Sequence, residues 1–140
     1  MNIENDLIEL FVSFIRENSQ FGDIIQFVKK VPLNMATFPT IVIKESNNSD
    51  YLSGMTLNRM EAVARITYQI DVYTKDIIYE NHKYMSSEVQ EELKDLIFFF
   101  FNQIGFTRIS CTRGEVISYE IDRTICLFEG KLGNWNKKIL

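Results

Sequence analysis

The residues that could carry out acid–base or metal chemistry are few and scattered. Histidine is the side chain used most often for proton transfer and metal binding near neutral pH. The chain has one, His82, which lies between Asn81 and Lys83 in a polar stretch. No second ligand follows His82 at the third or fourth position, where a helix would place it on the same face. We therefore expect His82 to be a solvated side chain.

Other catalytic motifs are missing from the sequence. Ser53-Gly54 lacks the glycine two positions before the serine that a nucleophile elbow requires, and the six glycines form neither a GxGxxG nor a P-loop pattern. The densest group of carboxylates is typical of a solvated helix face and comprises Glu88, Glu91, Glu92 and Asp95. The sequence thus predicts no catalytic residue, no cofactor-binding residue and no metal ligand, and we expect the protein not to be an enzyme.

The two cysteines, Cys111 and Cys126, belong to no CxxC motif and to no Cys/His cluster with zinc spacing. The simplest interpretation is a pair of free thiols in a reducing compartment. A disulfide between neighbouring strands and reactive thiol chemistry are the alternatives.

Composition indicates one globular domain over residues 1–140. Apolar residues make up 46% of the chain, with eleven Phe and six Tyr, whereas disordered chains are poor in aromatic residues. The net charge of -4 disfavours tight nucleic-acid binding, which depends on clustered Lys and Arg. Acids at the N-terminus argue against an export signal, and the longest apolar run, residues 96–101, is far shorter than the about 20 residues that cross a membrane.

Two segments have the apolar spacing of amphipathic helices. Residues 3–18 place Ile3, Leu7, Leu10, Phe11 and Phe14 on one face. Residues 82–104 form a second apolar stripe, and Gly105 supplies the helix stop. The Ser87–Gln90 spacing suggests a capping box within this helix or at its start. Its apolar stripe consists of Val89, Leu93, Leu96, Ile97, Phe100 and Ile104, with Phe101 at the margin.

Five segments have the β-branched composition or the alternation of strands. The clearest covers residues 62–73, where the even positions are apolar and the odd ones are mostly polar, so one face should be wet. The others cover residues 24–28, 40–44, 106–112 and 116–128, with a loop at 45–50 and a turn at Arg113-Gly114. The order predicts an α+β fold, with an antiparallel or mixed sheet of four to five strands and two helices packed on one face.

Phe98 and Phe99 do not fit the apolar stripe of the second helix. At 100° per residue they project toward the acidic face, and two adjacent aromatic side chains there need a partner. A neighbouring subunit is one candidate, since buried aromatic residues dominate interface energetics. The alternatives are cover by the C-terminal strands or tail, including Trp135, and contact with a membrane. A second candidate interface is the apolar loop that contains Tyr51, Leu52, Met55, Leu57 and Met60.

Three segments also resemble the tail terminator, or tail completion, proteins of tailed bacteriophages, which are often labelled minor capsid proteins. They are residues 38–43 (Phe-Pro-Thr-Ile-Val-Ile), residues 68–74 (Tyr-Gln-Ile-Asp-Val-Tyr-Thr) and residues 105–108 (Gly-Phe-Thr-Arg), the last after an amphipathic helix. Residues 119–123 fit loosely the Arg-containing strand that ends the family pattern. Taken in order, the likeness covers most of the chain.

The resemblance implies a structural virion protein that catalyses no reaction and needs no cofactor. The expected assembly is a homo-oligomeric ring, a hexamer, that caps the tail tube and meets the neck and head-completion proteins, with DNA passing through without specific binding. The expected place is the virion tail or neck, after assembly in the bacterial host cytoplasm. Other hypotheses are a different neck ring, such as a head-tail stopper or connector, and a small intracellular ligand-binding or adaptor domain that uses residues 51–60 as its mouth.

Overall fold

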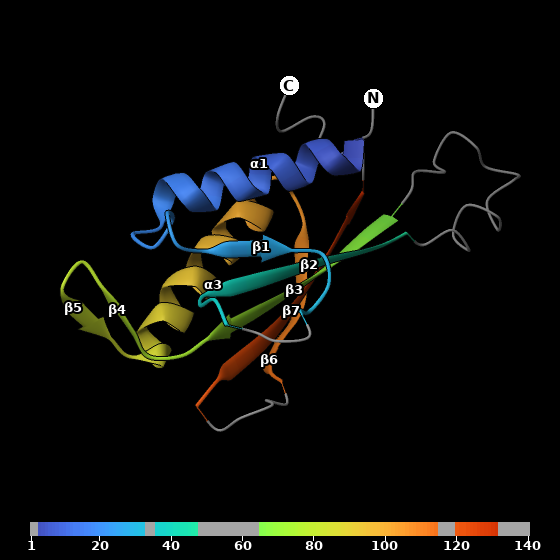
Figure 1. Ribbon diagram of the computed structural model, residues 1–140. Coiled ribbons are helices and arrows are strands. Elements are labelled where there is room, and N and C mark those ends of the chain that lie inside the picture. The colour runs from blue at the N-terminus through green and yellow to red at the C-terminus, as the bar shows by residue number, and fades with distance from the viewer. Residues whose placement is uncertain (1–2, 33–35, 48–64, 115–119, 132–140) are drawn as a thin grey trace, which may run out of the picture.

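The computed structural model describes residues 3–32, 36–47, 65–114 and 120–131. Two helices and seven strands lie in these ranges (Figure 1). In chain order they are α1 (Ile3–Asn18), β1 (Gln26–Val28), β2 (Thr40–Asn47), β3 (Arg65–Thr74), β4 (Ile77–Tyr79), β5 (His82–Tyr84), α3 (Ser86–Gln103), β6 (Thr107–Arg113) and β7 (Asp122–Lys131).

Five of the strands form one mixed sheet in the order β1-β2-β3-β7-β6, and β4 and β5 form a separate hairpin. Only β1 pairs in parallel, with the start of β2, while the other ladders are antiparallel. The register of β6 against β7 shifts between Arg108 and Ser110, which marks a β-bulge at Ile109. The predicted α+β fold with a mixed sheet is confirmed.

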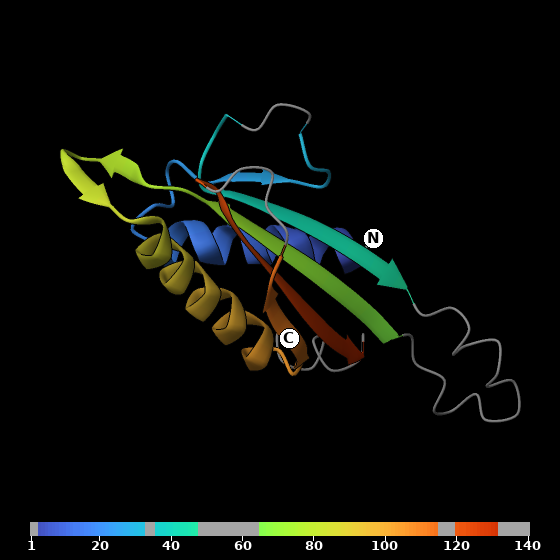
Figure 2. The ribbon, with the colours of Figure 1, turned by 90° about the horizontal axis from the view of Figure 1, so that it is seen from below.

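Both helices cover the same face of the sheet (Figure 2). α1 contributes Leu7, Phe11 and Ile15 to the core, and α3 contributes residues such as Leu93 and Ile97. The matching side chains of the sheet are Ile41, Ile43, Ile66, Tyr68, Ile70, Val72, Cys126 and Phe128. The even positions of β3 from residue 66 to 72 are therefore buried, as their alternation predicts.

α3 begins at Ser86, so the predicted start at residue 82 is wrong. Residues 82–84 pair with β4 through a two-residue turn at Glu80 and Asn81, whose φ angles are 51° and 63°. Two positive φ values are the signature of a type I′ hairpin turn, which usually carries glycine or asparagine. The missing glycine explains why the hairpin escaped the sequence prediction.

The predicted capping box at Ser87 and Gln90 is also wrong. The side chain of Glu88 instead accepts a hydrogen bond from the backbone N–H of Met85, and Asp76 accepts one from the N–H of Ser86. Gln90 is buried and donates to the carbonyl of Val72 at 2.9 Å. The first two bonds satisfy backbone N–H groups at the start of α3. The Gln90 bond fixes α3 against β3.

α3 ends at Gln103, and the predicted helix stop is confirmed at Gly105, whose φ is 88°. The N–H of Phe106 donates to the carbonyl of Phe101 at 2.9 Å, and that of Gly105 donates to Asn102 at 3.1 Å. The Phe101 and Phe106 rings lie 5.6 Å apart. These two bonds and the apolar contact form a Schellman motif, for which a residue in the left-handed region is required.

Several strand boundaries differ from the prediction. β2 continues to Asn47 because residues 45–47 pair with β3, so the expected loop is wrong for these three residues. β7 begins at Asp122 and runs to Lys131, so the predicted strand is wrong at residues 120–121, while its residues 116–119 lie outside the described ranges. On β3, Asp71 and Tyr73 are buried, so the expected wet face is wrong at this end of the strand.

Candidate assembly surface

An apolar patch lies where the C-terminal half of α3 meets α1. We define it as Leu10, Phe14, Phe98 and Phe99. Phe98 is 39% exposed and Phe99 is 53% exposed, so both rings still face solvent in the single chain. Phe99 stacks on Phe14, and the guanidinium of Arg108 lies 4.6 Å from the centre of the Phe98 ring. The fold therefore shields each of the two rings on one side only.

The run of four phenylalanines at 98–101 explains how the patch arises. Phe100 and Phe101 are buried, and both lie near Phe11 of α1. With 100° between consecutive residues, Phe98 and Phe99 cannot reach the same core. Two of the four rings are consequently left on the surface.

α1 contributes to the patch in a way that the sequence analysis missed. Its buried positions are Leu7, Phe11 and Ile15, spaced four residues apart along one face. Leu10 and Phe14, which were predicted to belong to this core stripe, lie at its margin, and Leu10 is 40% exposed. The predicted stripe is wrong at Leu10, because α3 covers only part of that face, whereas Phe14 is partly buried and packs against the core.

A second exposed apolar site is the hairpin formed by β4 and β5, which projects beyond the N-terminal end of α3 (Figure 2). Its inward side is fixed by Phe21, whose ring lies 6.0 Å from Tyr79 and 4.9 Å from Tyr84. Ile78 points the other way, as alternation along a strand requires, and is 78% exposed. Met85, at the base of the hairpin, is also exposed.

A carboxylate fixes the relative position of the two helices. Glu92 of α3 accepts hydrogen bonds from the Ser19 hydroxyl at 2.6 Å and from the Gln20 side-chain amide at 2.8 Å. It also accepts the backbone N–H of Gln20 at 3.2 Å. Glu92 was expected to be one of several solvated acids. It instead connects the turn after α1 to α3, as only the three-dimensional structure could reveal.

The opposite face of the sheet carries a buried ion pair. Arg123 of β7 donates to Asp71 of β3 at 2.7 Å, and the Gln69 amide donates to the same carboxylate at 2.9 Å. Asp71 is fully buried, and the Arg123 guanidinium lies 5.4 Å from the centre of the Tyr73 ring. Burial raises the pKa of Tyr73, Arg123 offsets part of this rise, and Asp71 adds to it. The pair explains how an aspartate can occupy a buried strand position.

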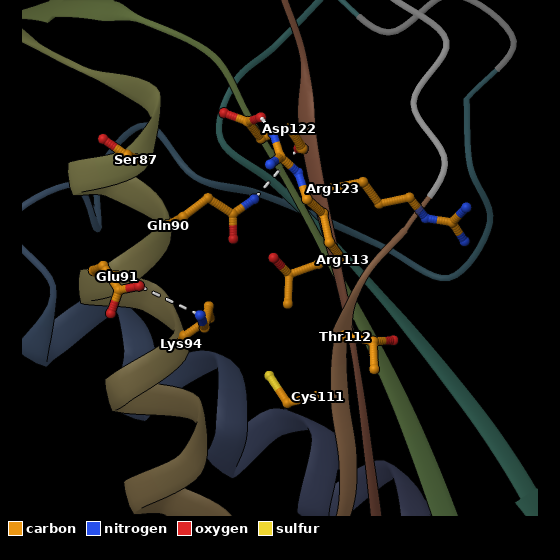
Figure 3. A pocket seen from close by; sticks show the side chains of 10 residues that line it. Ser87, Gln90, Glu91, Lys94, Cys111, Thr112, Arg113, Asp122 and Arg123 are labelled. Atoms are coloured by element: carbon orange, nitrogen blue, oxygen red, sulfur yellow. Dashed lines mark hydrogen bonds and ion pairs between the residues drawn. The ribbon is translucent and has the colours of Figure 1, made fainter. Parts of the chain in front are cut away.

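A polar groove of about 240 Å³ separates α3 from the strands β6 and β7 (Figure 3). Its charges are already paired: Lys94 contacts Glu91 at 3.4 Å, and Arg113 contacts Asp122 at 2.7 Å. The side-chain oxygen of Gln90 is buried there without a hydrogen-bond partner. Internal pairing leaves little net charge to attract an ionic ligand.

His82, the residue considered for proton transfer or metal binding, is exposed on β5. Within residues 3–32, 36–47, 65–114 and 120–131, no three His, Cys, Asp or Glu side chains gather as a metal site. Cys111 and Cys126 are free thiols.

Of the eight predicted interface residues, only Phe98 and Phe99 lie in the described part of the chain. Tyr51, Leu52, Met55, Leu57, Met60 and Trp135 lie outside it. The sequence analysis missed Leu10, Ile78 and Met85 as exposed apolar groups. Hairpin alternation could have indicated Ile78, whereas the exposure of Leu10 depends on where α3 packs.

Comparison with protein-family models and with curated proteins gives no match to this chain. In the described ranges, neither helix combines the length and the apolar character needed to cross a lipid bilayer.

Proposed function

We propose that this chain is a structural subunit that assembles with copies of itself into a ring that terminates a phage tail tube and joins it to the neck. The observation that carries the proposal is the pair of exposed rings, Phe98 and Phe99, on a helix that is otherwise well packed. Burial of a fully exposed Phe side chain gains about 1.5–3 kcal/mol, and at 39% and 53% exposure roughly half of that gain is left for a partner that covers Phe98 and Phe99.

The positions of the two apolar sites support a ring. Phe98 in the patch lies thirteen positions after Met85 at the hairpin, which corresponds to about 20 Å along α3. When two different surfaces of identical subunits meet, the contact is heterologous and repeats around a closed ring or along a filament. Contact between the hairpin of one subunit and the patch of the next is therefore a plausible geometry for a closed particle.

The partners implied by this function are other copies of the chain, the tail tube protein and the neck or head-completion proteins. The acidic balance of the chain, with a net charge of -4, suits a channel through which DNA passes without specific binding. The number of subunits proposed, six, and the place in the virion rest on the family resemblance alone.

Electron microscopy and native mass spectrometry of the purified protein test the proposal. We expect rings, or a ring-sized oligomer, at high protein concentration or after addition of tail tube protein. The double substitution Phe98→Ser and Phe99→Ser should abolish the oligomer while the chain remains folded. Val31→Ser is the matched control, since it removes another exposed apolar group outside both sites. A wild-type chain that stays monomeric under all these conditions would contradict the proposal.

A further inference from the structure

The two cysteines face each other across neighbouring strands. Cys111 of β6 lies directly opposite Cys126 of β7 in the antiparallel register, and their sulfur atoms are 2.7 Å apart. We propose that Cys111 and Cys126 form a reversible redox site, in which a low-molecular-weight disulfide oxidises the two thiols to a cross-strand disulfide.

The backbone already has the dimensions that the bond needs. Directly opposite residues of an antiparallel pair have Cα atoms about 4.5 or 5.5 Å apart, depending on the hydrogen-bonding position. Disulfides usually span Cα distances of about 4.4–6.8 Å. Either kind of pair therefore allows the bond without a change of register.

The exposure of the two thiols sets the order of the reaction. Cys111 is partly exposed and lines the groove between α3 and β6, together with the cationic side chains of Lys94 and Arg113 (Figure 3). Cys126 is only 2% exposed. An oxidant that enters the groove from solvent thus meets the Cys111 sulfur first.

Burial raises the pKa of Cys126, the hydrogen bond with Cys111 raises it further, and Lys94 and Arg108 offset part of the rise. Cys126 therefore stays protonated and unreactive toward solvent. It suits the second step, in which the attacked sulfur is its direct neighbour and no access from solvent is needed.

The electrons and atoms balance in two exchanges. The Cys111 thiolate attacks one sulfur of the small disulfide, breaks its S–S bond and releases one small thiolate, which leaves a mixed disulfide on Cys111. Cys126 then attacks the Cys111 sulfur, and its proton passes to the second small thiolate as that thiolate leaves. The protein loses two electrons and two protons, and the small disulfide gains both.

The bond would join β6, the outer strand of the sheet, covalently to β7. It closes the chain between residues 111 and 126, a loop of a length for which the constraint on the unfolded chain is substantial. If the chain is a virion subunit, as proposed above, the two cysteines would be free thiols while the particle assembles in a reducing cytoplasm. They would be oxidised to the disulfide after the particle leaves the cell. This timing rests on the proposed function, whereas the bond itself does not.

Oxidised glutathione, the low-molecular-weight disulfide used as the probe, tests the inference on the full-length folded protein. We expect a mass loss of about 2 Da, no free thiol toward maleimide after unfolding, and a peptide that links Cys111 to Cys126. The melting temperature should rise by about 5 °C or more, and a reducing thiol should reverse both changes.

Two variants show which thiol reacts first. Cys126→Ser should keep glutathione attached as a stable mixed disulfide on Cys111. Cys111→Ser should remain unmodified while folded. The inference is wrong if both wild-type thiols stay free, if the mixed disulfide on Cys111 accumulates without resolving, or if the bond forms only between chains. A linked monomer that never forms rings would leave this inference standing and remove the proposed function.

Discussion

The rings of Phe14 and Phe99 lie nearly parallel, with centroids 6.0 Å apart and planes inclined by 14°. This contact joins α1 to α3 at the edge of the core and forms the centre of the apolar patch. It holds a half-exposed ring in place, which in the proposed assembly would lower the entropic cost of burying that ring against a second subunit.

We expect Phe14 and Phe99 to be energetically coupled. Phe14→Leu and Phe99→Leu, singly and together, should give a coupling of about 0.5–1.5 kcal/mol in the free energy of unfolding, measured by urea denaturation of the monomer. The control cycle combines Phe14→Leu with Thr112→Ala, which lies exposed on β6. Additive losses in the Phe14–Phe99 cycle would show that the stacked geometry contributes nothing beyond buried area.

Removal of the Asp71 charge should strongly destabilise the folded protein. Asp71→Asn leaves the Arg123 guanidinium, whose side chain is 21% exposed, without its carboxylate, and should cost about 3–5 kcal/mol in the free energy of unfolding. Adding Arg123→Met should recover part of that loss. The control is Arg113→Met, which breaks the exposed pair with Asp122 and should cost less than about 1 kcal/mol. Similar losses for the two pairs would contradict this account.

Glu92→Ala should destabilise the protein by about 1.5–3 kcal/mol, because it removes the charged acceptor of the Ser19 and Gln20 hydrogen bonds. The neighbouring Glu91 is exposed and contacts only Lys94 on its own helix, so Glu91→Ala should change the free energy of unfolding by no more than about 0.5 kcal/mol. Chemical denaturation measures both. Equal effects would mean that Glu92 is merely a surface acid.

The raised pKa of Tyr73 predicts a loss of stability at alkaline pH. Burial is the main cause, and the folded state favours the protonated phenol more than the unfolded state does. The resulting stabilisation is fully present below the unfolded pKa of about 10 and is lost as pH rises toward and through the folded value. Urea denaturation between about pH 8 and pH 11 should show a shallower decline for Tyr73→Phe than for the wild type. Parallel curves would contradict the prediction.

The elements with strong periodicity were the ones that the sequence could predict. The apolar spacing repeats over two or more turns in α1 and α3 and over several residue pairs in β3, so these elements and their buried sides could be predicted. The Gly105 stop followed from the glycine after the last periodic residue. In each case the local preference and the tertiary packing favour the same conformation.

The failures have a common physical cause, which is that packing between distant segments decided the outcome. The hairpin has no glycine at its turn, yet Phe21 holds Tyr79 and Tyr84 in place. Its position in β3 predicts that Asp71 faces solvent, but Arg123, 52 positions away in the sequence, pairs with it. Neither relationship has a signal within a short window of sequence.

Only part of the candidate site could be predicted from the sequence, for the same reason. Phe98 and Phe99 stand out because four consecutive aromatic residues cannot all face one side of a helix. Leu10 gave no such signal, since its spacing matches a core stripe and only the offset of α3 leaves it exposed.

The bulge at Ile109 has a consequence for how subunits can join. It interrupts the hydrogen-bonding register of β6, the outermost strand, and Arg108 lies beside it. Irregular, charged margins of this kind are poor templates for an incoming β-strand from another molecule. In the proposed assembly, the β6 edge would therefore be a poor site for backbone pairing between copies of the chain, and side-chain contacts would have to join them at this edge.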